Sequence, residues 1–240
     1  MKKVILCGYN LIGCEVLNIL QEKGFQIFVY THKAPYHIPD LTSFCEKLNI
    51  EYSHEKISID NLPFKPDVIC SIYYRYIISK EIIDFCHGKI FNLHPSLLPN
   101  YRGCSSITWA LVNGEEHTGY TYHYISPQLD KGSIILQKRI LINSYDTQES
   151  LYNKVMLESK SDFLNVLMFV IQGRKGLKQN DGGKYYERGV PYGGKISSDW
   201  DIKKVERFIR AMIHPPYPLS TFNGYPIENL NDYLRLKNEK

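Results

Sequence analysis

An asparagine and a histidine stand two positions apart, where a short apolar stretch runs into a proline. The stretch 89–93 (KIFNL) predicts a buried strand that contains Asn92, and His94 follows it directly. Residues two apart on a strand face the same side, so the two side chains point together. An amide can donate to an oxyanion and an imidazole titrates near neutral pH, which fits acyl transfer to an amine. An alternative is that Asn92 caps a turn and His94 is a hydrogen-bonded histidine at a strand end, without a catalytic role.

A carboxylate further along the chain is the candidate third member. Asp130 lies in the turn 128–132 (QLDKG), which is expected to join two later strands. A carboxylate beside an imidazole fixes its orientation and raises its basicity. Asp-Lys-Gly is also common in turns, so the residues alone leave Asp130 open between these two roles. The sequence also leaves open whether His123 faces the ligand-binding crevice or packs in the apolar core.

The first half of the chain alternates between strands and helices. Strands are expected at 3–7, 25–31, 68–73 and 89–93, and helices at 14–23, 41–48 and 79–86. This alternation predicts an α/β fold with a mainly parallel sheet and helices on both faces. Ligands bind such sheets at the carboxyl ends of the strands, which is where Asn92 and His94 are expected.

The second half changes pattern. A helix is expected at 106–113, antiparallel strands at 118–125 and 134–142, and a long helix at 147–172. A glycine-rich linker (173–194), a helix (199–213) and turn and hairpin material follow, with a tight turn at 222–225. We therefore expect a catalytic domain over residues 1–180 and a short C-terminal helix and hairpin subdomain over 181–240.

Composition excludes several classes of protein. The net charge of +4 is spread along the chain and gives no support for nucleic acid as a partner. No signal peptide or membrane span is apparent, and the six cysteines form no C-x-x-C pair, so we expect a cytoplasmic protein with reduced thiols. The histidines form no H-x-x-x-H pair, so no metal site is predicted. The loop 8–13 lacks the middle glycine of an NAD fingerprint and the lysine of an ATP loop.

The motifs together resemble a known family. The stretch 91–103 (FNLHPSLLPNYRG), followed by Leu129, Asp130 and Gly132, is similar to the folate-dependent formyltransferases. The resemblance is clear over residues 67–142 and returns at 209–218. It implies a Rossmann-like formyltransferase fold and N10-formyltetrahydrofolate as the co-substrate.

The resemblance also implies roles by position. Asn92 would hold the formyl oxygen, His94 would act as the base, and Asp130 would orient His94. The pteridine would lie between two segments that contact it largely through backbone groups. Their residues are Tyr76, Ile77, Ile78, Ser126, Pro127, Gln128 and Leu129.

Within the family, the branch acting on sugar nucleotides fits best. Residues 219–240 are too few for the C-terminal barrel of the tRNA enzymes, and the phosphate-binding Gly-Ser-Gly loop of the purine enzymes is missing. We expect a nucleotide-linked amino-deoxysugar as acceptor, dTDP-4-amino-4,6-dideoxyglucose or a close 3-amino relative, in surface polysaccharide (O-antigen) synthesis. A homodimer is also expected. Cations for the pyrophosphate and flat rings for the base would come from Tyr74, Arg75, Arg102, Trp109, Arg188, Arg210 and Tyr217.

Three alternatives remain open. The same chemistry could act on another amine, such as glycinamide ribonucleotide. The chain could also be a non-catalytic module that binds a sugar nucleotide or folate. A dehydrogenase is the most distant alternative, because the second glycine of its fingerprint is missing.

Overall fold

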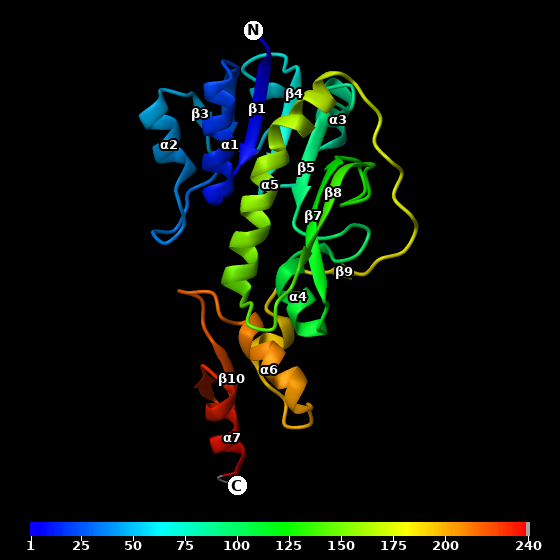
Figure 1. Cartoon of the computed structure of the whole chain (residues 1–240). Helices are drawn as coiled ribbons and strands as arrows, with labels where there is room; N and C mark the ends of the chain where they lie inside the picture. Colours follow the sequence, from blue (N-terminus) through cyan, green and yellow to red (C-terminus); the bar gives the residue numbers. More distant parts are fainter. Residues whose placement is uncertain (239–240) are drawn as a thin grey trace. The chain divides into compact units, whose positions relative to one another are not determined.

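The computed structural model describes residues 1–238 of the chain. Short runs of apolar residues form the central strands of a sheet in the order β3-β2-β1-β4-β5-β7-β8 (Figure 1). The strands are β1 (Lys3–Gly8), β2 (Gln26–Tyr30), β3 (Tyr52–Ser53), β4 (Val68–Ile72), β5 (Ile90–His94), β7 (His117–Tyr124) and β8 (Ile134–Leu141). Neighbours from β3 to β5 pair in parallel, and β7 runs antiparallel to β5. The predicted α/β fold with a mainly parallel sheet is confirmed.

Helices cover both faces of this sheet. Consecutive strand residues point to opposite faces, so Ile90 and Phe91 of β5 mark one face each. Ile90 packs in a buried cluster with Ile82 of helix α3 (Lys80–Phe85). On the other face, the ring of Phe91 lies 6.1 Å from that of Phe163, in helix α5 (Gln148–Ile171). The site residues of β5 are thus held on a strand that is packed on both sides.

Local signals in the sequence explain where several helices begin. The Asp40 carboxylate accepts hydrogen bonds from Thr42 N and Ser43 N, and so caps α2 (Leu41–Leu48). Asp201 caps α6 (Ile202–Ala211) in the same way, by accepting from Lys204 N. Helix α6 therefore starts three residues later than the sequence predicts. Helices α1 (Asn10–Glu22) and α4 (Ser106–Asn113) and a 3-10 turn at Ile59–Asn61 also precede α5.

The C-terminal part has more regular structure than the sequence predicts. The glycine-rich segment 173–194 contains β9 (Tyr185–Tyr186), which pairs with β6 (Arg102–Gly103), and a 3-10 turn at Pro191–Gly194. The expected hairpin is present as β10 (Ser220–Phe222) and β11 (Tyr225–Ile227), with positive φ at Asn223 and Gly224. Helix α7 (Leu230–Asn238) follows it, where only turn and hairpin material was expected.

The chain divides into two compact units. The first comprises residues 1–94, 121–137 and 157–180, and the second comprises 95–120, 138–156 and 181–240. Strands β7 and β8 and helix α5 each contribute residues to both units. In residues 1–238, no helix has the length and apolar character needed to cross a membrane.

Candidate active site

Strand β5 places Asn92 and His94 on one face of the sheet within the first unit. Neighbouring strands supply partners at the same level: Asn92 pairs with Ser71 of β4 on one side and with His123 of β7 on the other. The Asn92 Oδ1 accepts a hydrogen bond from Ser71 Oγ at 2.9 Å. The imidazole of His94 is buried, with 4% of its surface exposed. The predicted same-face pair is therefore present at the carboxyl end of a buried parallel strand.

The turn after β7 brings Asp130 to this pair. Asp130 Oδ2 lies 3.8 Å from His94 Nδ1, and Asp130 Oδ1 lies 3.7 Å from His123 Nε2. Asp130 has a positive φ of 54°, which aspartate tolerates better than most residues. A Cβ on Gly132 would lie 1.6 Å from the carbonyl oxygen of Tyr124, so only glycine lets the turn close onto β7. The motif glycine thus has a steric role in placing the carboxylate.

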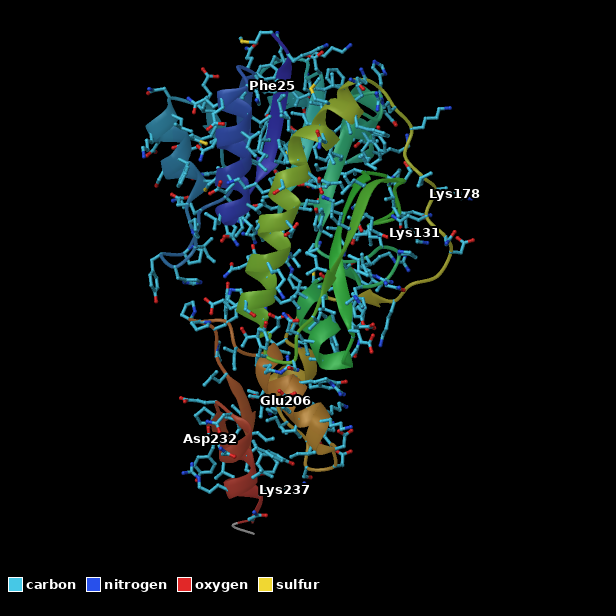
Figure 2. The ribbon with its side chains drawn as sticks, viewed as in Figure 1. Phe25, Lys131, Lys178, Glu206, Asp232 and Lys237 are labelled. Atoms are coloured by element: carbon cyan, nitrogen blue, oxygen red, sulfur yellow. The ribbon has the colours of Figure 1, made fainter. Side chains whose placement is uncertain are left out.

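A second segment holds the same turn from outside. The Gln179 amide donates to the carbonyl oxygens of Asp130 and Gly132, at 2.8 and 2.7 Å. Figure 2 labels Lys131, in the turn, and Lys178, in the extended segment that carries Gln179. This clamp could not be predicted from the sequence, because it joins residues that lie far apart in the chain.

His123 is a site residue that the sequence left open between the crevice and the core. Its Nε2 lies 3.2 Å from Asn92 Nδ2, and its Nδ1 lies 2.8 Å from the carbonyl oxygen of Tyr124. Burial, which outweighs the attraction of the Asp130 carboxylate, lowers the pKa of His123 to about 4, and nearby His94 contributes to this lowering. The imidazole is therefore neutral at neutral pH. The register of β5 with β7 sets His123 opposite Asn92, and spacing along the chain does not encode that register.

The two segments expected to hold folate lie in the same unit as the site. In the first, Tyr76 is half-buried, Ile77 is 62% exposed and Ile78 is buried. In the second, Ser126 bonds to the carbonyl of Gln128, whereas Pro127 and Leu129 expose apolar surface. Leu129 is 46% exposed directly before Asp130. Apolar surface next to buried polar groups is the lining that a flat heterocycle requires.

Two of the proposed acceptor-binding residues lie in this first unit. The Tyr74 hydroxyl accepts a hydrogen bond from Ile57 N at 3.0 Å, and its ring packs against the apolar core. Arg75 is exposed, and its guanidinium lies 5.3 Å from the centre of the Tyr76 ring. Of the two, Arg75 presents its polar group to solvent.

The other five lie in the second unit. Arg102 donates to the carbonyl oxygens of Gly182 and Gly183, and Arg210 is held by Glu206 and the carbonyl of Asp146. Their guanidinium groups thus already have protein partners. The Trp109 ring lies 4.7 Å from that of Tyr186. Arg188 is exposed, and Tyr217 is 51% exposed.

Comparison with known proteins identifies the family of this chain. The model of the formyl transferase family matches residues 20–167. A GDP-perosamine N-formyltransferase of Brucella melitensis is 34% identical over 224 residues, which cover 90% of this chain and 86% of that protein.

Solved structures agree in fold. The sugar 3N-formyl transferase WlaRD, solved in the presence of dTDP and 5-N-formyl-THF, has a TM-score of 0.83 and 27% identity, covering 95% of this chain and 85% of that one. An N-formyltransferase from Helicobacter canadensis, at 24% identity and a TM-score of 0.79, covers 95% of this chain and 87% of that one and shares the fold. The matched family model and the relative at 34% identity together place this chain in the formyl transferase family, among its sugar N-formyltransferases.

Proposed function

We propose that the enzyme transfers the formyl group of N10-formyltetrahydrofolate to the sugar amine of dTDP-4-amino-4,6-dideoxyglucose. The observation that carries this proposal is the gathering of Asn92, His94 and Asp130 on one face of the sheet, in a chain of this family. The nucleotide assignment is supported by WlaRD, whose structure was solved with dTDP.

A second acceptor has support of its own. The Brucella melitensis relative is a GDP-perosamine N-formyltransferase and is more similar in sequence than WlaRD, at 34% against 27% identity. GDP-perosamine is therefore the second candidate acceptor. The two candidates require the same chemistry at the amine and differ in the nucleotide and in the sugar.

The proposed roles follow from the chemistry of the three side chains. The Asn92 amide would donate to the formyl oxygen, and would do so more strongly once that oxygen carries negative charge. His94 would accept the proton that leaves the attacking amine. Asp130, at 3.8 Å from the imidazole, would orient His94 and favour its protonated form as the proton arrives.

Residues 76–78 and 126–129 would hold the folate, which supplies the formyl carbon. Exposed apolar side chains on both segments, Ile77 and Leu129, fit the faces of a pteridine. Burial of such a ring next to His94 and Asn92 would also exclude water, which would otherwise compete with the amine as a nucleophile.

The test is a transfer assay with a panel of acceptors. The purified protein is incubated with N10-formyltetrahydrofolate and dTDP-4-amino-4,6-dideoxyglucose, its 3-amino relatives, GDP-perosamine or glycinamide ribonucleotide. We expect mass spectrometry to show a formylated dTDP sugar. If GDP-perosamine alone is formylated, GDP-perosamine is the acceptor of this enzyme. Formylation of glycinamide ribonucleotide alone, or of no acceptor, would contradict the proposal.

We also propose a cytoplasmic homodimer. All six cysteines are free thiols, five of them buried, as expected in a reducing compartment. Light scattering of the purified protein would give the mass of the assembly, and the mass of a single chain would contradict the dimer.

A further inference from the structure

Three polar side chains form a row across three neighbouring strands. Ser71 of β4, Asn92 of β5 and His123 of β7 are paired in register, so they point to the same face. The next residue of the row, Cys7 of β1, is fully buried among apolar side chains. Ser71 is 5% exposed and His123 is 2% exposed. The polar groups of this row must therefore satisfy one another.

The hydrogens of this row can be assigned from its outer end. The carbonyl oxygen of Tyr124 can only accept, so His123 Nδ1, at 2.8 Å, must carry a hydrogen. In a neutral imidazole the other nitrogen, Nε2, then accepts. The Asn92 atom at 3.2 Å from Nε2 must be its amide nitrogen, which leaves the amide oxygen to accept from Ser71 Oγ.

From this geometry we infer that Ser71 and His123 are positioning residues, which fix the Asn92 amide with its oxygen toward Ser71 and its nitrogen toward His123. The nitrogen of Asn92 carries a second hydrogen, and this hydrogen is the donor to the formyl oxygen. If the Asn92 amide were rotated by 180°, its oxygen would face the formyl oxygen, and it could not donate a hydrogen bond there. The inference rests on the proposed role of Asn92 and adds the reason for its orientation.

The charge state of His123 decides which way the row is arranged. The charged or titratable groups that face its ring are Asp130, with Oδ1 3.7 Å from Nε2, and His94, with a ring centre 6.5 Å away. A hydrogen on Nε2 would oppose the hydrogen on Asn92 Nδ2, so the amide would turn its oxygen toward His123. Burial keeps the pKa of His123 at about 4, which preserves the productive orientation at neutral pH.

The first test removes the hydroxyl at one end of the row. In Ser71→Ala, kcat is expected to fall roughly 3- to 10-fold, while KM for both substrates stays within about twofold. Ser71→Thr keeps a hydroxyl and is expected to lose less. The matched control is Ser220→Ala, which removes a buried serine hydroxyl from strand β10, where it donates to the carbonyl of Ile227. If Ser71→Ala and Ser220→Ala have the same kcat, Ser71 is not a positioning residue.

A double mutant separates positioning from a general structural effect. If Ser71 acts only through Asn92, then adding Ser71→Ala to Asn92→Ala should change kcat by less than about twofold. The same loss in both backgrounds would mean that Ser71 acts by another route, and would overturn the inference. Thermal unfolding of each variant identifies any that fail to fold.

A third measurement does not depend on the acceptor. Nitrogen NMR of ¹⁵N-histidine-labelled protein reports which ring nitrogen of His123 carries hydrogen. We expect only Nδ1 of His123 to carry hydrogen from about pH 8 to about pH 5. A protonated Nε2 in that range would contradict the inference. If wild-type protein formylates no acceptor, the proposed function fails, while this spectrum still decides the orientation of the row.

Discussion

At the scale of single residues, the site depends on a histidine that stays neutral. His123 lies between the Asn92 amide and the Asp130 carboxylate, and its burial costs more than the carboxylate recovers, so its pKa falls to about 4. A protonated His123 would compete with His94 for the Asp130 carboxylate. When His123 is neutral, the Asp130 carboxylate has His94 as the imidazole that it can orient.

This neutral histidine predicts a pH dependence of stability. The unfolded chain protonates His123 near pH 6.5 and the folded chain near pH 4, so the unfolded state binds more protons between these values. The stabilisation linked to neutral His123 is therefore fully present above about pH 6.5. As the pH drops toward 4, the free energy of unfolding falls by up to roughly 3 kcal/mol. Denaturant titrations from pH 8 to pH 4 measure it.

The control for this prediction is His123→Gln, which removes the titrating group. His214 contributes in the same direction, because burial lowers its pKa too, so both proteins share that slope. The wild type should lose more free energy than the variant over this range. Equal losses in the two proteins would show that His123 is not held neutral by the fold.

The sequence predicted Asn92, His94 and Asp130 as one set, and the structure brings these side chains together, but the sequence did not decide the place of His123. The first three follow from the motif and from the alternation along a strand. The contact between Asn92 and His123 depends on the register of two strands separated by helix α4, and spacing along the chain does not encode register. Ser71 depends in the same way on the register of β4 with β5.

At the scale of elements, the turn that carries Asp130 is fixed at two places. Gly132 permits close approach to Tyr124, and Gln179 holds the carbonyls of Asp130 and Gly132. A tight turn alone would leave the Asp130 carboxylate free to sample several positions. The clamp by Gln179 limits that freedom, and so should matter for the geometry at His94.

Removal of the clamp gives a prediction at this scale. Gln179→Ala removes two hydrogen bonds, together about 1–3 kcal/mol, so kcat/KM for formyl transfer should fall roughly tenfold. Steady-state kinetics measure the change. The matched control is Lys178→Ala, which removes an exposed neighbouring side chain and should stay within about twofold of wild type. Equal activities in the two variants would refute the proposed role of Gln179.

Most helices and strands follow from the sequence, and the exceptions have a common cause. Helices α2 and α4 have the predicted bounds, because capping residues and a stop signal mark their ends: Asp40, Asn49 and Gly114. Strands β6 and β9 are two residues long, and each exists only because the other pairs with it. Helix α7 buries fully only Tyr233, so its apolar periodicity is weak.

At the scale of the whole molecule, the C-terminal region is part of the second unit rather than an addition to it. Strand β9 pairs with β6, and helix α6 packs against α4, so residues after 180 support residues before 120. Helix α6 buries Val205, Phe208 and Ile209. The catalytic domain over 1–180 and the C-terminal subdomain over 181–240 that the sequence indicates stay a prediction.

Truncation tests this dependence. A chain that ends at Asn180 loses β9 and α6, and the apolar surface that it exposes should lower the melting temperature by roughly 10 °C or more. The control chain ends at Asn229 and loses only α7, with its single fully buried Tyr233. Thermal unfolding followed by circular dichroism compares the two. If fragment 1–180 were as stable as the control, residues 95–120 and 138–156 of the second unit would not need residues 181–240.

The Asn92 amide is proposed to stabilise the oxyanion that forms as a formyl group passes to a sugar amine. The most direct measurement is kcat for formyl transfer to the preferred sugar nucleotide, in wild type and in Asn92→Ala. The predicted result is a loss of about 10²–10³-fold, or roughly 2.7–4 kcal/mol of transition-state stabilisation, with the fold intact. A kcat for Asn92→Ala within about threefold of wild type would contradict the account.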